Sequence, residues 1–167
     1  NKFQGHTDIP LNDVGKFQAS HAAPMIAAMD PTMIIASDLV RAQSTAHELV
    51  KLTGLEVLTD PRLRETNCGN WEGLTGDEIR KVDLDNLREW SMGGDNPAGG
   101  IGERRSEVGA RGFAAIMEAL DGKDIAIIEF EPFTQDVIGA AKSLKLIACC
   151  RNEPGANIDL ENAAKAG

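Results

Sequence analysis

Short apolar runs alternate with longer stretches of mixed polar and apolar residues along this chain. The runs at 33–36 and 125–128 are too short for helices and contain isoleucine, which favours strands covered on both faces. The stretches that follow them carry helix-capping residues and apolar positions at helical spacing. Because such an alternation is typical of α/β proteins, we predict a three-layer sandwich with a mostly parallel sheet.

The first long helix is predicted at 13–29. Asn12 can accept a hydrogen bond from the first turn and therefore serves as the helix cap. Pro24 lacks an N–H group and is expected to kink or interrupt this helix. Residues at helical spacing should lie near one face: Val14, Phe17, His21, Met25 and Ala28.

A strand that turns directly into a helix is the most informative stretch of the chain. Ser37 is a suitable cap for a helix that starts at Asp38 and ends at Gly54. Arg41 then lies in the first turn, where its planar guanidinium could hold a phosphate group and the free N–H groups of the helix add positive field. An arginine here is also common as a solvated surface residue, so both interpretations stay open.

The remaining chain continues the alternation. Thr75 and Glu78 have the spacing of a capping box at the start of another helix. The glycine-rich stretch at 93–102 is expected to be a flexible connection. The other predicted elements are a strand at 56–58, a helix at 103–120, a helix at 134–141, a strand at 144–150 and a helix at 159–166.

Length and composition fit a single α/β domain over residues 1–167. The formal net charge of −9 disfavours nucleic acid and anionic membranes as partners, because both attract basic proteins. No apolar run approaches the roughly 20 residues of a membrane span. Cys68, Cys149 and Cys150 lack the spacing of a zinc site, and an odd number of thiols favours a reduced, cytoplasmic setting.

Three separate motifs carry a family resemblance. Residues 4–12 read QGHTDIPLN, residues 37–46 read SDLVRAQSTA, and residues 63–73 read LRETNCGNWEG. In this order they resemble the histidine phosphatase superfamily, in its phosphoglycerate mutase-like branch. The similarity extends from residue 1 to about residue 128, so it covers the larger part of the chain.

This resemblance implies a phosphomonoester hydrolase or mutase that works through a covalent phosphohistidine. In such a reaction imidazole is the nucleophile, arginines offset the phosphoryl charge, and a carboxylic acid protonates the leaving oxygen. By position, Arg41 matches the second phosphate arginine and Glu65 the general acid. Gln4 and Gly5 fall in the loop that borders the substrate. The expected ligand is a small phosphorylated molecule or inorganic phosphate, with no cofactor and no metal.

The sequence departs from the family at both catalytic histidines. It contains no Arg-His-Gly triplet, so the first family strand is expected to be absent, and residues 129–132 read Glu-Phe-Glu-Pro where the family has Ser-His-Gly. His6, His21 and His47 fit neither role, and we expect each to be structural or solvent-facing. The resemblance therefore predicts a catalytically impaired chain. The alternative is a non-catalytic chimeric scaffold or anion-binding module.

The tail at about 129–167 resembles the substrate domain of D-isomer-specific 2-hydroxyacid dehydrogenases. A fragment of such an enzyme is thus a third interpretation, although the glycine-rich cofactor fingerprint is absent from the sequence. We expect the strand at 144–150 to pair beside 33–36 or 125–128, to replace the first family strand and so to complete the sheet. An exposed sheet edge would favour a homodimer.

Overall fold

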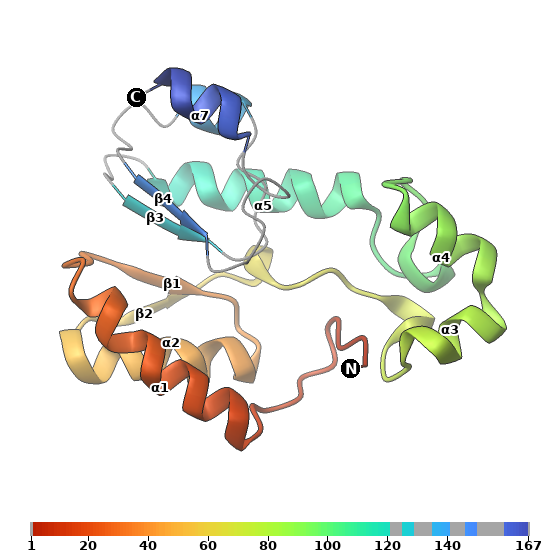
Figure 1. The fold of residues 1–167 in the computed structure, drawn as a ribbon, viewed down its shortest axis with the longest axis horizontal. Helices are drawn as coiled ribbons and strands as arrows, with labels where there is room; N and C mark the ends of the chain where they lie inside the picture. The colour runs from red at the N-terminus through yellow and green to blue at the C-terminus, as the bar shows by residue number, and fades with distance from the viewer. Residues whose placement is uncertain (1, 121–124, 129–134, 141–145, 150–158, 167) are drawn as a thin grey trace. The chain divides into compact units, whose positions relative to one another are not determined.

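The computed structural model describes residues 2–120, 125–128, 135–140, 146–149 and 159–166. The chain forms two compact units, 1–108 and 109–167, and their boundary falls within the long helix α5 (Arg105–Leu120) (Figure 1). The fold is α/β, with dominant helices and short parallel strands. Among the described helices, none is both long and apolar enough to cross a membrane.

The first unit begins with one helix followed by a β-α-β segment. The strands β1 (Ile34–Ala36) and β2 (Val57–Thr59) are parallel, with Ile34 opposite Val57 and Ala36 opposite Thr59. Helix α2 (Val40–Thr53) connects them, and α1 (Asp13–Ala27) packs against α2. Gly54 ends α2 in the left-handed conformation, with φ 71°, as the sequence predicted.

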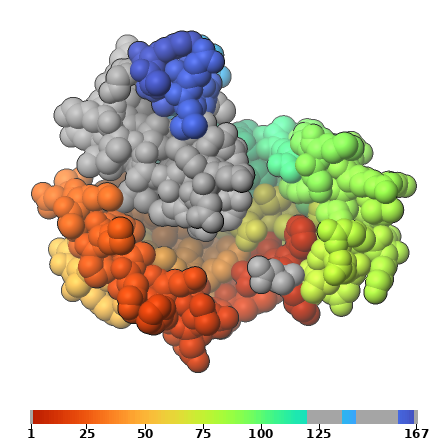
Figure 2. Space-filling model, viewed as in Figure 1, coloured from red at the N-terminus to blue at the C-terminus, as the bar shows by residue number. Residues whose placement is uncertain are grey.

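Helix α1 begins where it was predicted but differs in two respects. The Asn12 side chain accepts a hydrogen bond from the Gly15 N–H group, which confirms the cap. The helix is not interrupted at Pro24, because this residue lies in the last turn and the missing N–H removes a single helical bond. The expected apolar face is exposed, with Phe17 60% and Met25 71% accessible. Figure 2 shows the segment of α1 at the surface of the first unit. The small Ala19 and Ala23 are buried instead.

Helix α2 starts two residues later than predicted, and its cap comes from a distant loop. The Val40 N–H group donates to Asp8 Oδ1 at 2.7 Å, whereas Ser37 is buried and does not cap the helix. Asp38 therefore lies outside α2, and its carboxylate forms an ion pair with Arg64. The prediction of Ser37 as the cap was wrong because a local pattern cannot detect a carboxylate supplied from 32 residues away.

A cluster of buried residues forms a core in the first unit. Trp71, in the short helix η2 (Gly69–Trp71), is 1% exposed and donates from Nε1 to Asp83 at 2.8 Å. Ile79 of α3 (Gly76–Val82) is completely buried beside it. Thr75 and Glu78 form the predicted capping box of α3, and α4 (Leu84–Ser91) follows. The residues that pack against this core are Phe3, Leu74, Leu87 and Trp90.

The glycine-rich stretch packs against the loop at 67–71 through Ala98, Gly99 and Gly102, so the prediction of a flexible connection was wrong at these residues. It contains a short helix, η3 (Ala98–Gly100), and Ala98 is completely buried. A side chain on Gly99 would lie 2.6 Å from the Asn70 nitrogen and overlap the Cys68 carbonyl oxygen. The glycines of this stretch therefore allow two backbone segments to touch.

The described residues of the second unit form two parallel strands and two short helices besides α5. The strand β3 (Ile125–Ile128) pairs with β4 (Leu146–Cys149), with Ile125 opposite Leu146. This pairing confirms that the strand predicted at 144–150 lies beside 125–128, while its replacement of a family strand stays a prediction. Helix α6 (Gln135–Ala140) contacts α7 (Leu160–Ala166). The segment at 129–132 lies outside the described residues.

Candidate active site

Arg41 is the centre of the candidate site in the first unit. It is the second residue of α2, and its side chain is 15% exposed. The guanidinium donates from Nη2 to the Gly5 carbonyl at 2.8 Å and from Nη1 to the Thr7 carbonyl at 3.1 Å. Nη2 also forms an ion pair with Glu65 Oε2 at 3.0 Å. The structure thus brings together three of the four residues that the resemblance assigned to the site.

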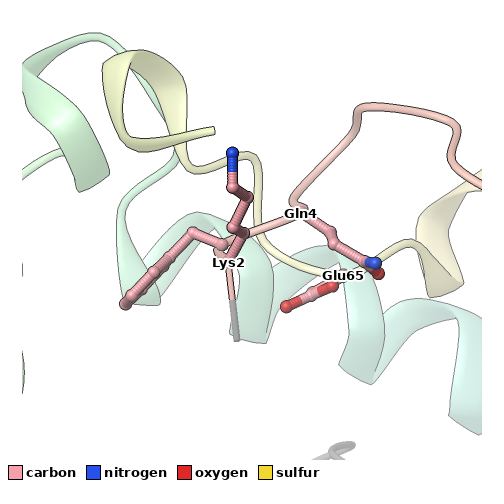
Figure 3. Close-up of a pocket in the computed structure, with 4 residues that line it drawn as sticks. Lys2, Gln4 and Glu65 are labelled. Carbon is pink, nitrogen blue, oxygen red and sulfur yellow. The ribbon is translucent and has the colours of Figure 1, made fainter. Parts of the chain in front are cut away.

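Gln4, the fourth assigned residue, lines two neighbouring pockets. One has a volume of about 460 Å³ and is lined by Lys2, Phe3, Gln4 and Glu65. Figure 3 shows that the amino group of Lys2 points away from the carboxylate of Glu65 in this pocket. The other pocket has about 240 Å³, and Arg41 lines it together with Gln4 and residues 9–12. A small ligand could therefore reach Arg41 from one pocket and Glu65 from the other.

Glu72 binds the loop that holds Arg41. Its carboxylate accepts hydrogen bonds from the backbone N–H groups of His6 at 2.7 Å, Thr7 at 2.9 Å and Cys68 at 3.2 Å. The Thr7 hydroxyl donates a further bond at 2.5 Å. Burial raises the pKa of Glu72, but the hydrogen bonds from Thr7, His6 and Cys68 outweigh it and lower the pKa overall. Glu72 is therefore ionised at neutral pH.

A second carboxylate fixes the segment that carries Glu65. Arg64 donates from Nε to Asp38 Oδ1 at 2.5 Å and from Nη2 to Asp38 Oδ2. The hydrogen bonds from Arg64 lower the pKa of Asp38. This bidentate pair joins Asp38, two residues before α2, to Arg64, the residue before Glu65, so it ties together the segments that carry Arg41 and the candidate acid.

The three histidines bind backbone carbonyls or carboxylates. His6 Nε2 lies 2.9 Å from the Glu65 carbonyl oxygen and 3.7 Å from Glu103 Oε2. His21 and His47 are exposed, and each contacts a carbonyl one turn earlier in its own helix. In the described part of the chain, no group of three or more histidine, cysteine, aspartate or glutamate side chains could hold a metal ion.

Cys68 is buried between the acidic residues of the site. Burial, with Glu65, Glu72 and Glu103 nearby, raises the pKa of its thiol to about 12. Since the thiolate is the nucleophilic form, Cys68 is inert at neutral pH.

The reactivity of Cys68 gives a pH-dependent prediction. In the folded protein, iodoacetamide should label Cys68 at pH 8 at least about tenfold more slowly than in urea, because a thiol with this pKa is almost wholly protonated. The rate in the folded state should rise steadily up to about pH 11. Peptide mapping by mass spectrometry separates Cys68 from the other cysteines. A rate that levels off near pH 8 would contradict the raised pKa.

Four residues of this arrangement were not predicted to act in it: Thr7, Asp8, Glu72 and Glu103. Thr7, Asp8 and Glu72 lie within family motifs, which was the available signal, whereas Glu103 lies outside them and had no such signal. Their partners lie far away in sequence, with His6 and Glu72 separated by 66 residues. The arrangement places the guanidinium of Arg41 beside the carboxylate of Glu65.

Comparison with known families identifies the class of protein. A model of the histidine phosphatase superfamily (branch 1) matches residues 1–128, and the chain belongs to this superfamily. This confirms the resemblance of the first part of the chain.

Individual relatives are phosphatases and mutases by name. Over 78 residues the chain is 45% identical to glucosyl-3-phosphoglycerate phosphatase of Mycobacterium tuberculosis. The aligned residues make up 47% of this chain and 35% of that protein. Over 120 residues it is 34% identical to the probable phosphoglycerate mutase GpmB of Yersinia pestis. This alignment makes up 72% of this chain and 56% of that protein. The chain thus spans about a third to just over half of these curated relatives.

Solved structures agree with this assignment. The native structure of the mycobacterial glucosyl-3-phosphoglycerate phosphatase matches with a TM-score of 0.68 and 31% identity, over 89% of this chain and 65% of that one. A structure of the same phosphatase with inorganic phosphate matches with a TM-score of 0.67 and 32% identity, over 89% and 66% of the two chains. The α/β fold is therefore that of histidine phosphatases.

Proposed function

We propose that this chain binds the phosphoryl group of a small phosphorylated molecule at Arg41, as part of a phosphomonoester hydrolase or mutase of the histidine phosphatase type. The observation that carries this proposal is the 3.0 Å contact between Arg41 Nη2 and Glu65 Oε2. A phosphate-binding cation and a carboxyl group able to protonate a leaving oxygen are adjacent. Gln4 and Gly5 border the ligand from the loop at 4–8.

The names of the relatives support a phosphorylated hydroxy acid or its glycosylated form as the substrate. One relative is a glucosyl-3-phosphoglycerate phosphatase and another a probable phosphoglycerate mutase. In such an ester, Arg41 would offset the charge on the phosphoryl oxygens. Glu65, in its protonated form, would donate a proton to the oxygen that leaves with the organic part.

We further propose that the chain of 167 residues is catalytically impaired. Phosphoryl transfer of this type needs an imidazole nucleophile in line with the phosphorus atom. His21 and His47 bind carbonyls of their own helices, and His6 Nε2 faces the Glu65 carbonyl and Glu103. An anion-binding module is therefore the second candidate function, and the same contacts favour it. The dehydrogenase-like and chimeric origin of the tail, the three-layer sandwich, the cytoplasmic location and a homodimer remain predictions.

Two assays test the proposed function. Isothermal titration with inorganic phosphate should give saturable binding, and hydrolysis of 4-nitrophenyl phosphate should stay at the buffer rate. Turnover above that rate, lost in both Arg41→Ala and Glu65→Ala, would show an active enzyme and contradict the proposed impairment. Absence of phosphate binding would contradict the proposed site. A change in NADH fluorescence on addition of the protein would instead favour the dehydrogenase interpretation.

A further inference from the structure

We propose that Glu72 is a positioning residue, whose carboxylate fixes the loop at 4–8 so that the Gly5 and Thr7 carbonyls direct Arg41 toward the phosphoryl group. The inference rests on the proposed phosphate site at Arg41 and extends it to a residue that makes no ion pair with that arginine.

The first argument is the number of donors that Glu72 collects. Its Oε1 accepts from the His6 and Cys68 N–H groups, and its Oε2 accepts from the N–H and hydroxyl groups of Thr7. Three of these four donors belong to the loop that contacts Arg41. A half-buried carboxylate with both oxygens occupied holds neighbouring backbone groups more firmly than a neutral acceptor could.

The second argument is that Glu72 and Arg41 bind the same peptide group. The carbonyl of Gly5 and the N–H of His6 belong to one planar unit, in which the two groups point in opposite directions. Arg41 donates to the carbonyl at 2.8 Å, and Glu72 accepts from the N–H at 2.7 Å. Rotation of this peptide would break both bonds. The negative carboxylate also polarises the peptide and strengthens the carbonyl as an acceptor for Arg41.

The third argument is the glycine between the two charges. Gly5 is buried and has φ +54°, a conformation that favours glycine. A side chain here would overlap Glu72 Oε1 and lie 2.9 Å from the Cys68 nitrogen. The absence of a Cβ atom is therefore what allows the carboxylate to reach the loop. Glu72 thus binds the N–H groups of the loop at 4–8, while the Gly5 and Thr7 carbonyls of the same loop accept hydrogen bonds from Arg41.

The test is a double-mutant cycle on phosphate affinity. Glu72→Gln keeps the size of the side chain but replaces one of its two carboxylate oxygens by an NH₂ group. Each of these oxygens accepts hydrogen bonds from two donors, so the variant loses two of the four bonds. We expect about tenfold weaker binding of inorganic phosphate by isothermal titration. If Glu72 acts through Arg41, the variant with both Glu72→Gln and Arg41→Ala should bind as weakly as Arg41→Ala alone. A residue that merely stabilises the fold would not give this non-additive result.

Glu78→Gln is the matched control. Glu78 also accepts from a backbone N–H and a threonine hydroxyl, both of Thr75, but it does so at the start of α3. Its replacement should leave phosphate affinity unchanged. Amide hydrogen exchange supplies a readout without phosphate, because Glu72→Gln should speed exchange at His6 and Thr7. If Glu72→Gln does not fold, Thr7→Val removes one donor to Glu72 and should weaken phosphate binding about two- to fivefold.

The outcomes separate this inference from the proposed function. If Arg41→Ala weakens phosphate binding and Glu72→Gln does not, the positioning role is wrong and the phosphate site stands. The same holds if Glu72→Gln weakens binding equally with and without Arg41. If the unaltered chain shows no saturable binding of phosphate, the proposed site and the inference built on it both fail.

Discussion

Replacing Arg41 by alanine should weaken the binding of inorganic phosphate by at least about tenfold. A charge-assisted hydrogen bond contributes about 1.5–3 kcal/mol, and 1.4 kcal/mol corresponds to a factor of ten. Arg41 is largely enclosed, so its field is less screened than that of a surface cation. Isothermal titration at low ionic strength measures the change.

Two further variants make the Arg41 prediction specific. Arg80→Ala removes an exposed arginine that pairs with Asp77 on α3, and it should leave phosphate affinity unchanged. Arg41→Lys keeps the positive charge but loses the two guanidinium NH₂ groups that bind the Gly5 and Thr7 carbonyls. Its affinity for phosphate should therefore lie between those of the unaltered protein and Arg41→Ala. Equal affinity in the unaltered protein and in Arg41→Ala would exclude this arginine as the phosphate ligand. Circular dichroism of each variant shows whether the fold is retained.

Replacing Gly99 by alanine should destabilise the first unit by about 3 kcal/mol or more. The new methyl group would overlap the Cys68 carbonyl and lie within 2.8 Å of the Trp71 nitrogen, so a backbone segment must move. The residue also has φ +56°, which adds about 1 kcal/mol for any residue with a side chain. Unfolding in urea, followed by tryptophan fluorescence, measures the loss.

The neighbouring glycine provides the control for this prediction. Gly100 has φ +76°, but a Cβ atom there would meet no atom within 4 Å. Gly100→Ala should therefore cost only the backbone term of about 1 kcal/mol. If the two variants are destabilised equally, the close approach of the segments at 66–71 and 98–102 does not contribute to stability.

Features that depend on a few adjacent residues could be predicted from the sequence. Asn12 caps α1, Gly54 ends α2, and Thr75 with Glu78 forms the capping box of α3. In each case the donor and acceptor lie within about four residues, so the sequence alone contains both partners. The strands at 33–36 and 125–128 were also recognised, because short isoleucine-rich runs have few other structural solutions.

Features that depend on distant partners could not be predicted. The cap of α2 comes from Asp8, and the packing of the glycine-rich stretch depends on the loop around Asn70. The same limit applies to the site. Motif positions indicated Arg41 and Glu65, whereas the role of Glu72 became visible only when its donors were brought together by the fold.

Gln4 borders both pockets, while its neighbour Gly5 has no room for a side chain. Of these two neighbours, only Gln4 can change the shape of the pockets by substitution. A saturation library at Gln4 would alter the entrances to Glu65 and to Arg41 at once, so a gain for one ligand should be accompanied by a loss for another.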